Sequence, residues 1–329
     1  MGAAFLATVL FALSVVFASR TTRALGGVQA NLWRLAVATL LLGLWAHLIG
    51  AGLGGGGFGW FFLSGCIGFG LGDLALYLSL PRVGPRLAGL LVQCLAPPFA
   101  AVAEWLWLDS APTGRQLLAG IAILTGVGVA VAPRGRLRAG SRSVNWGVAY
   151  GVVAAWGQGL GAVISRKAYL AVELAGGQVD GLTAAYQRIL GGLLVAVPAS
   201  ILLLARRGFR LGPGGSGGAK PGFAAPVAGG GTGREPRSEP APAARRIRLG
   251  AGLPIWVWVV LNALAGPALG VGCYQWALAT TPSAVVLPIV ATMPILLIPL
   301  AWWMEGDRPS RRSVIGGVIA VGGAVAMAV

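Results

Sequence analysis

The sequence contains one long stretch twice, and this internal repeat limits the possible fold more than any other feature. Residues 77–126 and 274–323 align without a gap at an offset of 197 positions, and eight or more positions are identical. The identical pairs include Tyr77 and Tyr274, Pro85 and Pro282, Pro97 and Pro294, Trp105 and Trp302, Pro112 and Pro309, Arg115 and Arg312, Gly120 and Gly317, and Gly126 and Gly323. A repeat of this length predicts two copies of one structural unit.

Long apolar runs recur along the whole chain and predict an integral membrane protein. Hydrophobic residues make up 56% of the sequence and charged residues 10%, whereas a soluble domain carries about 25% charged residues. Runs of about 20 apolar residues can cross a bilayer as helices, which satisfy their own backbone in lipid. The net charge of +16 lies mainly between these runs, which favours a membrane-surface role over nucleic acid binding.

Ten apolar segments can be delimited, and each predicts one transmembrane helix. They lie near 3–19, 30–50, 58–80, 84–107, 116–132, 144–165, 182–205, 253–278, 283–304 and 313–329. The first segment lacks the basic start of a signal peptide, so we expect it to be a true helix of the bundle.

Segments two and seven each carry one arginine early in an apolar run, Arg34 and Arg188. This match extends the repeat to five helices per half, spanning 1–135 and 136–329. Because five is odd, the second half enters the membrane from the opposite side. The expected fold is therefore all-α and membrane-integral, with ten transmembrane helices as two inverted five-helix repeats, an architecture typical of transporters.

Residues 206–252 interrupt the second repeat. This stretch is rich in Gly, Pro, Ala and Arg and has few large apolar side chains, which predicts a disordered loop. The loop either docks on anionic lipid or serves as a solvated tether whose charge helps to set the topology.

The sequence carries no catalytic or metal-binding pattern. Its three cysteines, Cys66, Cys94 and Cys273, lie inside apolar runs without a CxxC spacing, and His47 is the one histidine. No GxxxxGK[ST] motif for a nucleotide occurs. We therefore expect no enzyme activity and no cofactor.

Four ionisable residues of the predicted membrane spans are candidates for function, because such groups are costly inside a membrane. Arg34 and Asp73 are displaced toward one face of the membrane, and Glu104 and Arg188 toward the other. Two ion pairs are therefore possible. The pairs act as gates, or Asp73 or Glu104 carries a coupling proton, or the pairs only hold helix ends in place. Tyr77 lies one turn after Asp73 on the same face.

A second set of candidates is polar or aromatic and lies near the middle of the membrane. Its members are Gln93, Pro97, Trp156, Gln158, Asn262 and Thr292. A proline frees carbonyl groups one turn earlier, which can then face a substrate. These residues either line a substrate cavity at the repeat interface or form hydrogen bonds between helices, worth about 1 kcal/mol each.

The chain resembles the drug/metabolite transporter superfamily, and within it the ten-helix EamA-type transporters. The resemblance rests on Arg34 and Arg188, on the helices with Pro97 and Pro294, and on the turn GDRPSRRSVIGG at 306–317. The first-half turn departs from the pattern, because Asp109 lies three residues before Pro112 instead of two. The resemblance implies a secondary transporter in the plasma membrane, often an exporter of amino acids or other small metabolites.

Alternatives remain within and outside this class. Glu104 beside Trp105 and Trp107 is compatible with a cation exporter of the multidrug kind, and a non-transporting scaffold is a further possibility. The expected partners are a small-molecule substrate and the lipid bilayer, with anionic lipid at the basic loop. The orientation stays open: the excess of Lys and Arg on the side of the 206–252 loop places both termini outside, whereas the resemblance implies both inside.

Overall fold

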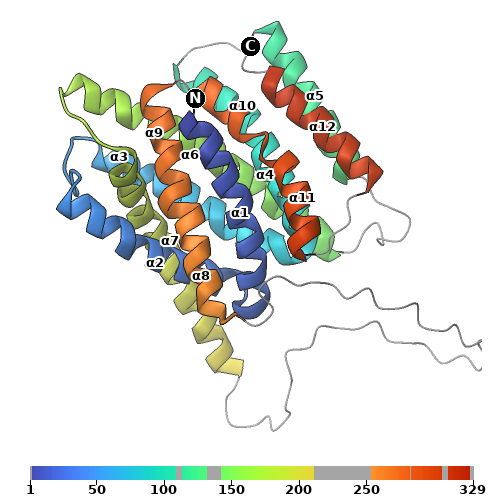
Figure 1. Cartoon of the computed structure of the whole chain (residues 1–329), viewed down its shortest axis with the longest axis horizontal. Helices are drawn as coiled ribbons and strands as arrows, with labels where there is room; N and C mark the ends of the chain where they lie inside the picture. The colour runs from blue at the N-terminus through green and yellow to red at the C-terminus, as the bar shows by residue number, and fades with distance from the viewer. Residues whose placement is uncertain are drawn as a thin grey trace, which may run out of the picture.

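The computed structural model describes residues 2–108, 113–131, 142–210, 253–281, 283–305 and 310–326, and every regular element in these ranges is a helix (Figure 1). The elements are α1 (Gly2–Leu25), α2 (Gly27–Leu48), α3 (Phe58–Gly65), the π-helical η1 (Cys66–Gly72), α4 (Asp73–Leu108), α5 (Gly114–Val131), α6 (Arg142–Leu174), α7 (Gly181–Arg210), α8 (Ile255–Ala263), the π-helical η2 (Leu264–Ala268), α9 (Leu269–Thr280), α10 (Ser283–Val290), α11 (Met293–Glu305) and α12 (Arg311–Ala326). The loop predicted from 206 begins later, because residues 206–210 continue α7. The rest of that loop up to 252, and the acidic turns at 109–112 and 306–309, lie outside the described residues.

Six helical stretches of the described chain are long and apolar enough to cross a membrane, so the protein is a multi-pass membrane protein. They are Gly2–Leu25, Gly27–Leu48, Phe58–Trp107, Ser143–Leu174, Gly181–Leu202 and Ile255–Thr280. Shorter apolar helices lie at Leu118–Val127 and Met293–Met304. The arrangement of ten helices as two inverted repeats stays a prediction at this point.

The stretch Phe58–Trp107 is interrupted at Gly84. Its 50 residues would extend roughly 75 Å as one helix, more than twice the ~30 Å of a hydrocarbon core. Gly84 has φ 80° and ψ 165° and lies inside α4 between Pro81 and Pro85. The backbone therefore breaks where the sequence predicted the boundary between its third and fourth segments.

We expect Gly84→Ala to cost about 1–3 kcal/mol of stability, because the conformation at Gly84 is essentially restricted to glycine. A Cβ added there would meet no atom within 4 Å, so the cost would come from the backbone alone. Thermal unfolding of the purified protein would measure it. Gly120→Ala is the matched control, since a Cβ at Gly120 also meets nothing within 4 Å and its φ is not positive. Equal melting temperatures for the two variants would contradict the prediction.

The two π-helical stretches lie at equivalent places in the two halves. The repeat offset takes 66–72 to 263–269, and η2 occupies 264–268. η1 contains three glycines, and η2 contains Gly266 followed by Pro267. A π-helical stretch widens one turn of a helix and is frequent at functional sites. The structural match thus extends upstream of the sequence repeat that begins at Tyr77.

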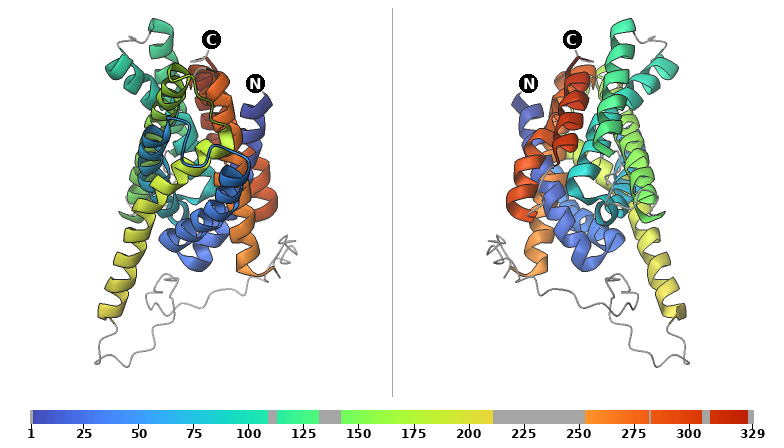
Figure 2. Two further views of the ribbon diagram at one scale, coloured as in Figure 1. Left: turned by 90° about the vertical axis from the view of Figure 1, so that its left-hand side faces the viewer. Right: turned by 90° about the vertical axis from the view of Figure 1, so that its right-hand side faces the viewer.

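Helices of the first half pack against helices of the second half. The second-half helix α7 lies against α3 and η1, and the first-half helix α2 lies against α8 and η2. Glycines permit the first contact: a Cβ at Gly65 would lie 1.7 Å from the carbonyl oxygen of Arg188, and one at Gly191 would lie 2.0 Å from that of Phe62. Figure 2 shows the resulting bundle, in which α1 begins at the end where α12 finishes.

Asp180 sets the start of α7. Its carboxylate accepts hydrogen bonds from the backbone N–H groups of Leu182 and Thr183, each at 3.0 Å, and from the indole of Trp45 at 3.2 Å. The Thr183 hydroxyl donates to it as well. Partial burial opposes ionisation, but these donors outweigh it and lower the pKa of Asp180 below its usual value. The carboxylate therefore caps α7 in its charged form.

Candidate functional site

A cavity of about 60 Å³ lies in the core of the bundle. Its polar side chains come from α1, α2, α4 and α6, and they are Ser14, Arg34, Asp73, Gln93 and Gln158. Glycines from both π-helical stretches, Gly72 and Gly266, complete the wall together with apolar residues. The volume is enough for a few water molecules. Four of the candidates predicted from the sequence thus line one cavity.

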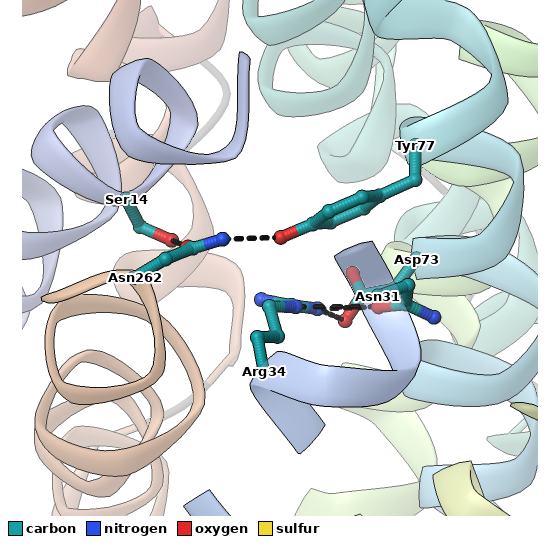
Figure 3. Close-up of polar contacts among 6 residues, drawn as sticks. All are labelled: Ser14, Asn31, Arg34, Asp73, Tyr77 and Asn262. Carbon is teal, nitrogen blue, oxygen red and sulfur yellow. Dashed lines mark hydrogen bonds and ion pairs between the residues drawn. The ribbon is translucent and has the colours of Figure 1, made fainter. Parts of the chain in front are cut away.

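The predicted pair of Arg34 and Asp73 is present beside this cavity (Figure 3). The guanidinium of Arg34 donates to the Asp73 carboxylate. Through Nε and Nη2 it also donates to the amide oxygen of Asn31, at 3.2 Å each. Its carbon lies 4.9 Å from the ring centre of Tyr77. The two charges are buried, at 6% and 15% side-chain exposure, so each depends on the other for compensation.

A chain of hydrogen bonds next to the pair joins the two halves. The amide nitrogen of Asn262 donates to the Tyr77 hydroxyl at 2.6 Å, and the Ser14 hydroxyl donates to the amide oxygen of Asn262 at 2.8 Å. Figure 3 shows the three side chains in a row from α1 across α8 to α4. Tyr77 and Asn262 were predicted, whereas Ser14 and Asn31 were missed. Asn31 could have been found, because it precedes Arg34 by three residues and so shares its helix face.

Three predicted substrate-binding residues lie away from the cavity. Trp156 is 41% exposed and lies on the outer side of α6. Because it is two positions before Gln158, about 200° of helix rotation separates the two, and only one can face the cavity. Thr292 donates to the carbonyl of Ile289 at 2.6 Å in the break between α10 and α11. Pro97 is buried in α4 and is not among the described residues that line the cavity.

The second pair that the sequence allowed, Glu104 with Arg188, is not among the ion pairs of the described residues. The Arg188 guanidinium lies 5.1 Å from the ring centre of Phe69 and within range of the Asp73 charge. Glu104 is half-buried near the end of α4. The sequence could place both residues near one membrane face, but it could not show that η1 and α6 enclose the Arg188 side chain.

The aromatic rings next to Glu104 already contact a lysine. The ammonium of Lys167 lies 4.1 Å from the ring centre of Trp107 and 4.7 Å from that of Trp60. Trp105 is 45% exposed on the outside of the bundle. Since Lys167 takes the place that a cationic substrate would need, the arrangement does not favour a site for organic cations here.

Comparisons with known proteins agree with this picture. No curated protein matches the sequence significantly. Among solved structures, 28 chains match. One of them, a crystal structure described only as that of a protein, has a TM-score of 0.58 over 99% of this chain and 96% of its own, at 16% sequence identity. At this sequence identity the similarity is evidence for a shared fold and not for a shared function.

The family comparison covers both halves. The model of the EamA-like transporter family matches residues 1–132 and 242–329, which together are most of the chain. The two matched regions contain the cavity residues of α1, α2, α4 and η2, and Gln158 of α6 lies between them. The protein belongs to the EamA-like transporter family and is a membrane transporter of small molecules.

Proposed function

We propose that the protein is a secondary transporter that exports small organic metabolites, such as amino acids, across the plasma membrane by alternating access. The observation that carries this proposal is the core cavity, whose polar wall combines side chains of both halves with two π-helical stretches. Interrupted helices that meet near the middle of the membrane are a common way to build a substrate site in transporters.

The proposed architecture is two inverted five-helix repeats, 1–135 and 136–329. The break at Gly84 supports it, because it divides Phe58–Trp107 into two segments of spanning length. Counting α8, η2 and α9 as one span, and α10 with α11 as another, the described helices supply ten segments. The equivalent positions of η1 and η2 support the repeat, and the crossed packing of α2 and α7 supports the interface between the halves.

The proposed gate lies where the two halves are joined by polar contacts. Arg34 and Asp73 hold α2 to α4, and the bond from Asn262 to Tyr77 ties the second half to the same place. A rocking movement of one half against the other would have to break the Asn262–Tyr77 bond. The bond is worth about 1 kcal/mol, which is small enough for the movement to be reversible.

We expect Gln93→Ala and Gln158→Ala each to raise the half-saturating substrate concentration about threefold to tenfold, because each removes one hydrogen-bonding group from the cavity wall. The measurement is flux of a panel of labelled amino acids in proteoliposomes. Trp156→Leu is the control on the same helix as Gln158, since Trp156 is on the outer side, and it should transport like the wild type. Wild-type kinetics in both glutamine variants would show that the substrate does not use this cavity.

A further inference from the structure

A second buried arginine site lies beside the cavity, built around Arg188 of α7. The residue is 3% exposed, and its Nε has no hydrogen-bond partner in the described part of the chain. The hydroxyl groups of Tyr169 and Tyr274 are equally unpartnered there, in residues that are 6% and 1% exposed. Both hydroxyls lie within range of the Arg188 charge. Three hydrogen-bond donors thus share one buried region.

Comparison of the repeats shows what distinguishes this region from the first site. Arg188 corresponds to Arg34, and the repeat offset takes Tyr77 to Tyr274. The same offset takes Asp73 to Gly270. A Cβ at Gly270 would lie 2.3 Å from the carbonyl oxygen of Ala265 and 3.0 Å from the ring of Phe11. The second half therefore keeps the arginine and the tyrosine, but the packing excludes a carboxylate of its own.

Asp73 does not fully compensate the charge of Arg188. Asp73 interacts with it electrostatically, but the Asp73 carboxylate is already paired with Arg34. Two buried guanidinium groups thus share one carboxylate. Arginine stays protonated in proteins, and an uncompensated charge in the membrane interior is costly. A further negative charge next to Arg188 would offset this cost.

Residues that contact the Arg188 site also line the central cavity. Nη2 lies so close to η1 and α6 that a Cβ at Gly68 would be 2.9 Å from it and one at Gly161 would be 3.3 Å away. Phe69, whose ring covers Arg188, also lines the cavity. Phe11 lines the cavity too, and its ring lies 5.9 Å from that of Tyr274. Each of these two rings thus contacts both the cavity and a residue of the arginine site.

We propose that Arg188, Tyr169 and Tyr274 form a binding site for a small monovalent anion, either a carboxylate or a halide. A guanidinium offers only donors, and each phenol hydroxyl can turn its O–H toward an anion, so the group suits a negatively charged ligand. If the anion is a carboxylate, it is that of the transported substrate, and this reading rests on the proposed function. If it is a halide, the site is a separate ion site of the transporter.

The test is the melting temperature of the purified full-length protein in detergent, measured against chloride, formate and acetate in turn. Ionic strength is held constant with gluconate, which is too bulky for a site among three side chains. We expect the wild type to gain about 3 °C at ten times the dissociation constant. Arg188→Gln should lose the gain. Tyr274→Phe and Tyr169→Phe should weaken it severalfold, and they keep the proposal testable if Arg188→Gln does not fold. Tyr186→Phe is the control: Tyr186 also lies on α7, but its hydroxyl is hydrogen-bonded to His47, so this variant should keep the gain in melting temperature.

The outcomes distinguish a halide from a substrate carboxylate, and they test the anion site separately from the proposed transport function. A gain with chloride assigns a halide site, and a gain with the carboxylates alone assigns the carboxylate of a substrate. No anion-dependent gain, or an equal gain in Arg188→Gln and both tyrosine variants, overturns the anion site. Because this readout needs no transport, amino acid flux in proteoliposomes stays an independent test of the proposed function.

Discussion

The Asp73→Asn variant is expected to lose about 3–5 kcal/mol of stability, because it leaves Arg34 as an uncompensated buried charge. In the structure Arg34 is 5% exposed, and its one ionic partner among the described residues is Asp73. Adding Arg34→Gln to the same chain removes the orphaned charge and should restore most of the loss. The measurement is thermal or denaturant unfolding of the purified single and double variants, with Gln93→Ala as a cavity control that carries no charge.

The same variants decide between the two roles that the sequence left open for Asp73. If the residue is a structural and gating partner of Arg34, stability falls in Asp73→Asn and returns in the double variant. If Asp73 instead carries a coupling proton, Asp73→Asn keeps its stability and substrate exchange but loses proton-driven accumulation. The observed ion pair, with further bonds from Arg34 to Asn31, makes the first result the expected one.

Gly65→Ala is expected to cost roughly 3 kcal/mol or more and to reduce the yield of folded protein sharply. The added methyl would lie 1.7 Å from the carbonyl oxygen of Arg188 and 2.8 Å from its Cα. These are backbone atoms of α7, so no side chain can move aside, and the two helices would have to separate. Because α7 also carries the Arg188 side chain, the separation would displace the proposed anion site.

Gly59→Ala is the matched control for this prediction. Gly59 lies in the same helix, α3, and a Cβ there meets no atom within 4 Å. Alanine at an open helical position stabilises by up to about 1 kcal/mol. Size-exclusion profiles and melting temperatures of the two variants give the comparison. Equal behaviour would mean that α3 and α7 do not pack as closely as the structure shows.

Much of the fold was predictable because it depends on positions along the chain. The apolar runs predicted a helical membrane protein, and the expected gap between segments 58–80 and 84–107 lies next to the break at Gly84. Depth in the membrane follows from residue position at about 1.5 Å per residue. This is why the sequence could pair Arg34 with Asp73 and could place Gln93 and Gln158 at one level.

The sequence could not determine how each helix is rotated about its own axis. A helix that is apolar on all sides carries little periodic signal, so its rotation is set only by packing on its neighbours. For this reason Trp156 was grouped with Gln158, although the structure places it on the outer side.

The same ambiguity left the surroundings of Arg188 open. The predicted depth in the membrane allowed an ion pair between Arg188 and Glu104. In the structure, α7 packs closely on η1 through glycines, and the Arg188 side chain lies near Phe69, Tyr169 and Tyr274. The sequence by itself thus determined the class of protein and contained the internal repeat from which the two halves were predicted. Only the tertiary structure decided which of its polar groups meet, because helix rotation and crossing are set by close contacts between residues far apart in the chain.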